Sequence, residues 1–263
     1  MIKLNADQIK DFQICERLYD YRHIEKMSEP IPGRTLNTLK FENTLKNIVH
    51  FFFYKKQAGI VPSYASLLNR WEKLWFPKGT TAYDITHEQH ESLYGNTASL
   101  TTKAAAALLS LVDNFSDTSI IPMGIDHEYT VPIVDGVYME DKFDLIYHKN
   151  NKTYVVKWAF NHKMKNEFMH TAEMAGMYKA FLNQYGNKIL TTEFGYYDLI
   201  SPKPEFIKYD VGHEDIEALV YWCNSIKKEE VYPSRRGLTT YCKSCPFDTP
   251  CSKWVAWKKK ESI

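Results

Sequence analysis

Four cysteines near the two ends of this 263-residue chain have the spacing of metal ligands. Cys242 and Cys245 are separated by two residues, Cys251 follows after five more, and Cys15 lies near the amino terminus. Two thiolates three positions apart can bind one metal centre, and a tetrahedral thiolate site needs four ligands. Cys223 lies in an apolar helical segment, which predicts a buried core position for it. We therefore expect the other four cysteines to bind metal, as a zinc site or an iron–sulfur site.

A second group of residues has the chemistry of a divalent-cation site. Asp144 lies on a segment over 137–148 that predicts a strand, and Lys157 lies on the next such segment, over 153–160. Glu128 is the first residue of the strand expected before them, over 128–134. Cleavage of a phosphodiester with Mg²⁺ or Mn²⁺ uses two carboxylates to hold the ion and a lysine to orient or activate water. These residue types therefore point to metal-dependent phosphodiester chemistry.

The basic residues of the C-terminal tail suggest contact with nucleic acid. The tail has nine basic and four acidic residues over 227–263, whereas the whole chain has a net charge of +1. Lysines alternate with aromatic residues in this tail, at Lys253, Trp254, Trp257, Lys258 and Lys259. Such a pattern permits both phosphate contact and base stacking. The alternative is a solvated terminal helix whose lysines complement its dipole and whose tryptophans pack inward.

The composition is that of a folded globular chain. Hydrophobic residues make up 44% of it and aromatic residues 14%, which excludes disordered, collagen-like and coiled-coil classes. The sequence contains neither of the glycine-rich loops that bind nucleotide phosphates or dinucleotides. We find no signal peptide and no apolar run near the roughly 20 residues of a membrane span, so we expect a cytoplasmic protein without membrane contact.

The order of the expected elements predicts an α/β domain with a mixed sheet. Helices are expected over 5–27, 36–58, from Pro62–Ser63 onward and over 101–115; strands over 128–134, 137–148 and 153–160; then a helix over 165–185, strands over 189–199 and 205–210, and helices over 213–228 and 252–260. We expect a single domain over 1–263. It would have a helical N-terminal lobe over 1–120, an α/β core over 121–228, and a cysteine-containing basic tail over 229–263.

The cysteine pattern resembles that of the iron–sulfur nucleases of the RecB and AddB type. Within the PD-(D/E)XK superfamily it is most similar to the compact CRISPR-adaptation nucleases and their phage relatives. The resemblance implies a restriction-endonuclease-like mixed sheet with a cysteine-stapled C-terminus. It implies a [4Fe-4S] cluster on Cys15, Cys242, Cys245 and Cys251, with Asp144 as the first ligand of a catalytic Mg²⁺ or Mn²⁺. It also implies DNA as the partner.

The sequence departs from this family's catalytic pattern on the third strand. The family has an acidic residue, any residue and then a lysine, where this chain has Lys157, Trp158 and Ala159. Lys157 would then pair with Asp144 and place a fixed positive charge where the metal should be.

Two helical motifs of the family are altered as well. The metal-binding histidine of an early helix falls on Lys46, or on His50 in a shifted register. The Gln-x3-Tyr motif of a later helix appears as Met174 and Tyr178, without its glutamine.

A migrated carboxylate could restore the site. Glu140, Asp141 and Glu173 are the candidates, with Lys157 as the catalytic lysine. Alternate side chains of a strand share a face, so Glu140 should lie beside Asp144 while Asp141 points away. We therefore expect Glu140 or Glu173 to be the better second ligand.

Three functions follow as expectations. The first is an iron–sulfur PD-(D/E)XK-fold protein of DNA metabolism that has lost catalysis and serves as a DNA-binding or assembly factor in recombination, replication or packaging. The second is an active Mg²⁺- or Mn²⁺-dependent DNA exonuclease or endonuclease with a rearranged site. The third is a protein-interaction scaffold without a nucleic-acid role.

Overall fold

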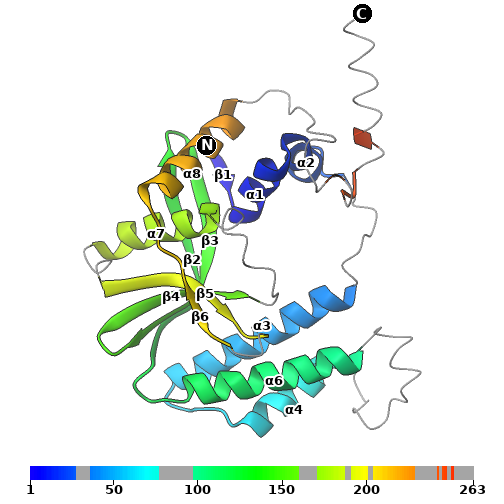
Figure 1. The fold of residues 1–263 in the computed structure, drawn as a ribbon, viewed down its shortest axis with the longest axis vertical. Helices are drawn as coiled ribbons and strands as arrows, with labels where there is room; N and C mark the ends of the chain where they lie inside the picture. Colours follow the sequence, from blue (N-terminus) through cyan, green and yellow to red (C-terminus); the bar gives the residue numbers. More distant parts are fainter. Residues whose placement is uncertain are drawn as a thin grey trace, which may run out of the picture.

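The computed structural model describes residues 1–27, 36–76, 97–159, 171–186, 191–200, 204–228, 242, 245–247 and 250–251 (Figure 1). Its helices are α1 (Ala6–Ile14), α2 (Glu16–Tyr19), the π-helix η1 (Asp20–Ile24), α3 (Leu36–Gln57), α4 (Tyr64–Trp75), α6 (Thr97–Phe115), α7 (Thr171–Tyr185) and α8 (His213–Lys228). Its strands are β1 (Ile2–Leu4), β2 (Ile121–Val134), β3 (Val137–Lys149), β4 (Lys152–Ala159), β5 (Thr192–Asp198) and β6 (Phe206–Lys208). The chain has an α/β fold.

The six strands form one mixed sheet. The order is β1-β3-β4-β5-β6, and β2 pairs with the other edge of β3. β1 pairs with β3, and β4 with β5, in parallel, whereas the pairs β2–β3, β3–β4 and β5–β6 are antiparallel. On one edge of β3, β1 pairs with Val137–Met139 and β4 with Leu145–Lys149. Residues 140–144 of that edge lie between these two pairings, and this part of β3 carries Glu140, Asp141 and Asp144.

The helices α1, α7 and α8 cover one face of the sheet. Their apolar side chains share a core with β2, β3, β4 and β5, which includes Val131, Met139 and Val155. Gly176 lets α7 approach β3 closely, because a Cβ atom there would lie 2.2 Å from the sulfur of Met139. This close packing brings the first turn of α7, with Glu173, next to the strands.

The helices α3, α4 and α6 cover the opposite face. An aromatic core holds them together and against the sheet, with Phe53 stacked on Trp158 at 5.7 Å and Trp71 stacked on Trp75 at 5.0 Å. Ser63 caps α4 by accepting a hydrogen bond from the backbone of Ser66, as its sequence position predicts. These three helices of the predicted N-terminal lobe therefore pack as one layer against the sheet.

The expected helix over 5–27 is interrupted at Cys15. This residue is extended, with φ −167° and ψ 124°, and it ends α1 and precedes α2. Residues 2–4, which the sequence did not predict to be a strand, pair with β3. The predicted single helix was wrong at Cys15, where the bend depends on tertiary contacts. The strand over 2–4 was not predicted, because a strand of three residues depends on its partner.

The other elements agree with the sequence except at their ends. β2 begins at Ile121 rather than residue 128, and α6 begins at Thr97 rather than residue 101. The expected helix over 252–260 lies outside the described residues. Among the helices described, none is long and apolar enough to cross a membrane.

Candidate functional site

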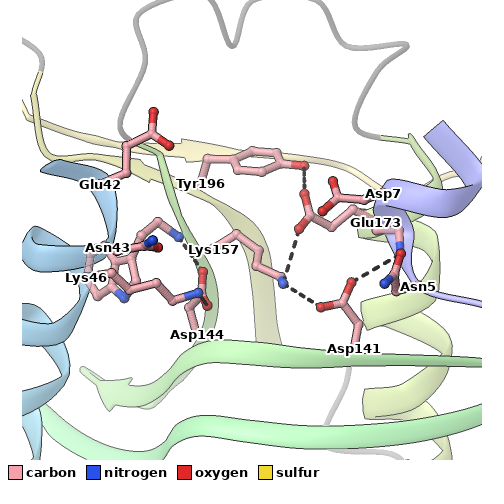
Figure 2. Close-up of a pocket in the computed structure, with 12 residues that line it drawn as sticks. Asn5, Asp7, Glu42, Asn43, Lys46, Asp141, Asp144, Lys157, Glu173 and Tyr196 are labelled. Carbon is pink, nitrogen blue, oxygen red and sulfur yellow. Dashed lines mark hydrogen bonds and ion pairs between the residues drawn. The ribbon is translucent and has the colours of Figure 1, made fainter. Parts of the chain in front are cut away.

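A pocket of about 410 Å³ lies between α1, α3, α7 and the sheet (Figure 2). Most of its lining is polar or charged, and it combines acidic and basic side chains from elements far apart in sequence. The lining residues are Asn5, Ala6, Asp7, Glu42, Asn43, Lys46, Asp141, Asp144, Lys157, Trp158, Glu173 and Tyr196. Both residues predicted to remain from a catalytic site, Asp144 and Lys157, are among them.

The Lys157 ammonium lies among carboxylates. Its Nζ is 3.0 Å from Asp141 Oδ1 and 3.2 Å from Glu173 Oε1. The hydroxyl of Tyr196 donates a hydrogen bond to the other oxygen of Glu173, at 3.1 Å. Asp141 also accepts a hydrogen bond from the backbone N–H of Ala6, at 3.4 Å, in the first turn of α1. Strand β4 thus places a buried cation between the starts of two helices.

Asp144 is held by two different donors. Its Oδ2 accepts a hydrogen bond from the backbone N–H of Trp158 at 2.9 Å, across the space between β3 and β4. Its Oδ1 lies 2.6 Å from the Nζ of Lys46, which comes from the middle of α3. The Asp144 side chain is buried, whereas Lys46 is 37% exposed at the pocket wall. Lys46, one of the two residues expected at the histidine position of the early helix, therefore contacts Asp144.

These contacts set the charge of the site. Burial favours neutral lysine, but the carboxylates of Glu173, Asp144 and Asp141 outweigh it and hold the pKa of Lys157 well above its ordinary value. Burial likewise favours neutral Asp144, yet the ammonium groups of Lys157 and Lys46 lower its pKa. Burial raises the pKa of Glu173, which Lys157 only partly opposes. The acidic residues of the pocket are therefore balanced by the ammonium groups of Lys157 and Lys46.

The contact between Asp141 and Lys157 corrects the strand argument. Asp141, expected to point away, pairs with Lys157, whereas Glu140 pairs with Lys3 of β1 at 2.7 Å. Simple alternation fails because residues 140–144 lie where β3 passes from pairing with β1 to pairing with β4. Glu173, the other candidate, does lie in the pocket.

The remaining catalytic candidates lie elsewhere. Glu128 is 79% exposed and pairs with Lys142 at 3.3 Å, and it does not line the pocket. Met174 is fully buried in the core. Tyr178 packs against Phe194, with ring centroids 5.6 Å apart, and lines a different pocket.

Sequence reasoning did not single out several residues of the site. Tyr196 is one, because a tyrosine on a strand carries no signal of its partner. Asn5 and Asp7 are candidate caps of the first helix in the sequence; in the structure Asn5 caps α1 through a capping box with Gln8, and Asp7 lies in its first turn. The sequence thus indicates where the helix starts, although not that its start faces the pocket.

The four predicted metal-binding cysteines come together at the break between α1 and α2. Cys15, Cys245 and Cys251 pack against a small core of Leu18, Tyr21 and Phe247. The rings of Tyr21 and Phe247 are 5.2 Å apart. The backbone of Cys245 bonds to that of Cys242 at 3.5 Å, and the backbone of Cys251 to that of Phe247 at 3.0 Å. The C-terminal cysteines therefore fold over the break between α1 and α2.

The thiols of this group influence one another. Burial raises the pKa of Cys245, and the thiols of Cys15, Cys251 and Cys242 raise it further. Several thiolates close together repel each other unless a cation lies between them. The arrangement has the charge and donor chemistry of a metal-binding site.

The fifth cysteine and the basic tail are the remaining features that were predicted from the sequence. Cys223 is fully buried in α8, as predicted, and burial raises its pKa to about 12. The proposed nucleic-acid contacts lie outside the described residues: Lys253, Trp254, Trp257, Lys258 and Lys259.

Comparisons with known proteins add distant likeness to solved structures and no family. No protein-family model matches the chain, and no curated protein matches it. Among solved structures, the crystal structure of SSO0001 aligns with 95% of this chain and 85% of its own chain, at 10% sequence identity and a TM-score of 0.36. The assignment to the α/β class therefore rests on the chain's own helices and mixed sheet.

Proposed function

We propose that this chain is a nuclease-like protein of DNA metabolism that binds DNA without cleaving it. In this proposal the sheet is of the PD-(D/E)XK type, the Asp144 pocket has lost its catalytic cation, and an iron–sulfur cluster joins the two ends of the chain. The protein would act as a DNA-binding or assembly factor in recombination, replication or packaging.

The position of Lys157 carries the proposal. A nuclease of this type needs a divalent ion between acidic residues of adjacent strands. Here the Lys157 ammonium contacts Asp141 and Glu173, and Lys46 contacts Asp144, so these three carboxylates already have cations beside them. A divalent ion placed between Asp144 and β4 would meet the positive charge of Lys157 at close range. We infer that the pocket does not form the family's catalytic centre.

We propose that the cysteine group binds an iron–sulfur cluster, with a zinc ion as the alternative. Thiolates are ligands for both, and Cys15, Cys245 and Cys251 share one small core. When bound, the cluster would hold the tail against α1 and α2 through Cys15.

DNA binding is supported by the charge of the tail. Nine basic residues and four acidic ones lie over 227–263, and the fold brings part of this tail to α2 by way of Phe247. Lysines bind phosphates and the two tryptophans can stack on bases, so the tail has the chemistry for single-stranded DNA in particular.

A paired assay of cleavage and binding tests the proposal. The purified protein is incubated with labelled single- and double-stranded DNA in Mg²⁺ and in Mn²⁺, and DNA retention is measured against salt concentration. We expect retention at low salt that weakens as salt rises, and no cleavage above that of Asp144→Asn. Replacing Lys258 and Lys259 with glutamine should weaken retention. Lys152→Gln serves as the matched control, because that exposed lysine is paired with Glu193 on the sheet.

Two outcomes would overturn the proposal. Metal-dependent cleavage that disappears in Asp144→Asn would identify the chain as an active nuclease with a rearranged site. Absence of DNA retention at low salt would favour a protein-interaction scaffold instead.

A further inference from the structure

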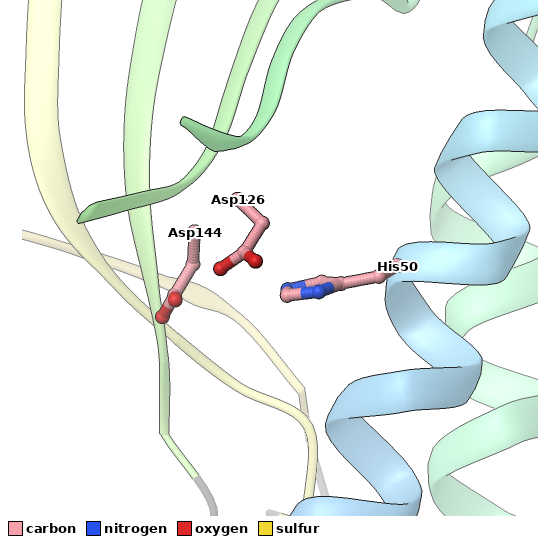
Figure 3. A group of neighbouring side chains, drawn as sticks. All are labelled: His50, Asp126 and Asp144. Atoms are coloured by element: carbon pink, nitrogen blue, oxygen red, sulfur yellow. The ribbon is translucent and has the colours of Figure 1, made fainter. Parts of the chain in front are cut away.

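Three potential metal ligands come together where α3, β2 and β3 meet. They are His50 of α3, Asp126 of β2 and Asp144 of β3 (Figure 3), and one ligand atom from each lies within 4.8 Å of the other two. Ligands about 2.1 Å from one ion lie roughly 3 to 4.2 Å apart. A small movement of these side chains would therefore place all three around a single cation.

One buried polar atom of this group has no hydrogen-bond partner. Within the described part of the chain, His50 Nε2 is buried and unpaired. Asp144 is 3% exposed, and its Oδ1 contacts the Lys46 ammonium as an ion pair at 2.6 Å. A buried imidazole nitrogen without a partner is costly in a folded protein, and a bound cation satisfies it.

The backbone of β2 is unusual where it carries Asp126. This residue has φ +49°, in the left-handed region that few residues other than glycine adopt. The pairing of β2 with β3 runs through Ile125 and Leu145 and resumes at His127 and Phe143, without Asp126. The Tyr54 hydroxyl of α3 donates to the backbone carbonyl of Ile125 at 3.3 Å, which holds α3 against this point of the strand. The irregularity thus lies where α3 and β2 meet.

Two lysines hold the carboxylates of this group. Lys142 is 3.3 Å from Asp126 Oδ2 and equally far from Glu128. Lys46, one helical turn before His50, is 2.6 Å from Asp144 Oδ1 and 37% exposed. An exposed lysine on a flexible side chain can turn to solvent, so a metal ion can replace its ammonium beside Asp144.

We propose that His50, Asp126 and Asp144 bind one divalent transition-metal ion, of the Mn²⁺ or Zn²⁺ class, in exchange for the Lys46 ammonium. One imidazole and two carboxylates are a mixed donor set that suits such ions. The site shares Asp144, and His50 in the shifted register, with the site that the family resemblance implies, but its second carboxylate comes from β2 and not from β4. It leaves Lys157 in place.

Binding of Mn²⁺ to the full-length protein tests the site directly. Mn²⁺ is the chosen probe because thiolates prefer softer ions, so the cysteine group competes little for it. Protein treated with a chelator is titrated with Mn²⁺ by calorimetry and by the loss of the free-ion electron paramagnetic resonance signal. We expect one ion per chain, with binding weakened at least about tenfold in Asp126→Asn and tightened in Lys46→Met. Glu140→Gln, on the same strand as Asp144 but paired with Lys3, is the matched control and should bind as wild type does.

The outcomes separate this inference from the proposed function. Absence of Mn²⁺ binding by both wild type and Lys46→Met would overturn the metal site, as would an Asp126→Asn protein that binds like wild type. Lys46→Met keeps the test decisive, since this half-exposed residue lies outside the core. DNA cleavage is measured separately in the same samples: bound Mn²⁺ without cleavage upholds both ideas, whereas Mn²⁺-dependent cleavage would overturn only the inactive-nuclease proposal.

Discussion

The Asp144 pocket and the cysteine group both concentrate acidic side chains, and they differ in what balances the charge. In the pocket, Lys157 lies 3.0 and 3.2 Å from Asp141 and Glu173, so the chain supplies its own cation. In the cysteine group, burial raises the pKa of Cys245, and the neighbouring thiols raise it further. The first region therefore carries its own balancing cation, whereas for the second we propose a bound metal centre.

The two regions also differ in how they are held. The pocket lies between packed helices and the sheet, so its geometry follows from the hydrophobic cores on both sides. The cysteines pack on a core of only Leu18, Tyr21 and Phe247. We infer that the pocket is formed by folding alone, and that the closure of the two chain ends depends on the metal centre.

Loss of a cysteine ligand should have the largest effect. In Cys245→Ser we expect loss of bound iron and sulfide and of the visible absorption of the cluster, because one of four ligands is gone. The accompanying loss of stability would be part of the roughly 10 kcal/mol that a structural metal centre can contribute to folding. Iron and sulfide analysis with thermal unfolding measures both.

Cys223→Ala is the matched control for this change. It removes a buried thiol from α8, so a modest loss of stability with full iron content is expected. Equal loss of iron in both variants, or a colourless wild-type protein that contains zinc, would contradict the iron–sulfur cluster proposed for the cysteine group.

Removal of the internal cation should be the next largest change. Lys157→Met keeps the length of the side chain but leaves Asp141, Glu173 and Asp144 without the buried ammonium. We expect a loss of about 3 to 5 kcal/mol in the free energy of unfolding, measured by urea denaturation. Lys3→Met removes an exposed pair with Glu140 and should cost at most about 1 kcal/mol. Equal losses in both would show that the pocket is not internally balanced.

The acidic side of the pocket should be visible in the pH dependence of stability. Because burial raises the pKa of Glu173, the folded state holds its proton to higher pH than the unfolded state. Stability from this group is therefore present below the ordinary pKa near 4.5 and is lost as pH rises through the raised value. In Glu173→Gln this downward step should be missing.

Denaturation curves across that pH window measure the difference. The control is Glu217→Gln, a 67% exposed residue of α8, whose profile should follow that of wild type. A Glu173→Gln profile that still shows the step would assign it to another group.

The hydroxyl of Tyr196 should have the smallest effect. Tyr196→Phe removes one hydrogen bond to Glu173 and leaves that carboxylate in contact with Lys157. A loss of about 1 to 2 kcal/mol is expected, since the bond is to an acidic group at a buried site. Tyr221→Phe, at an exposed position of α8, should change stability by less than about 0.5 kcal/mol.

Much of the fold was predictable because its elements are long and strongly patterned. The predicted strands over 137–148 and 153–160 correspond to β3 and β4, and the helix over 213–228 corresponds to α8. Apolar periodicity fixes such elements locally. β1 has three residues and no such pattern, and its pairing with β3 exists only in the folded chain.

The candidate site was predictable in its residue types and less so in its geometry. Asp144 and Lys157 line one pocket, as their positions on adjacent strands suggested. The partner of Lys157 was predicted wrongly, since Asp144 was expected and Lys157 pairs with Asp141 and Glu173 instead. The contribution of Asp126 had no sequence signal, because it depends on a local irregularity of β2.

The sequence by itself determined the ligand chemistry of this protein: four thiols in a metal-binding pattern, and lysine in place of an acid at position 157. Only the tertiary structure decided which charges meet. Ion pairs such as Lys46–Asp144 join α3 to β3 across nearly a hundred residues of chain, and they form because two hydrophobic cores pack those elements onto one sheet. Hydrophobic burial is set by local pattern, whereas side-chain contacts depend on the register and twist that packing produces.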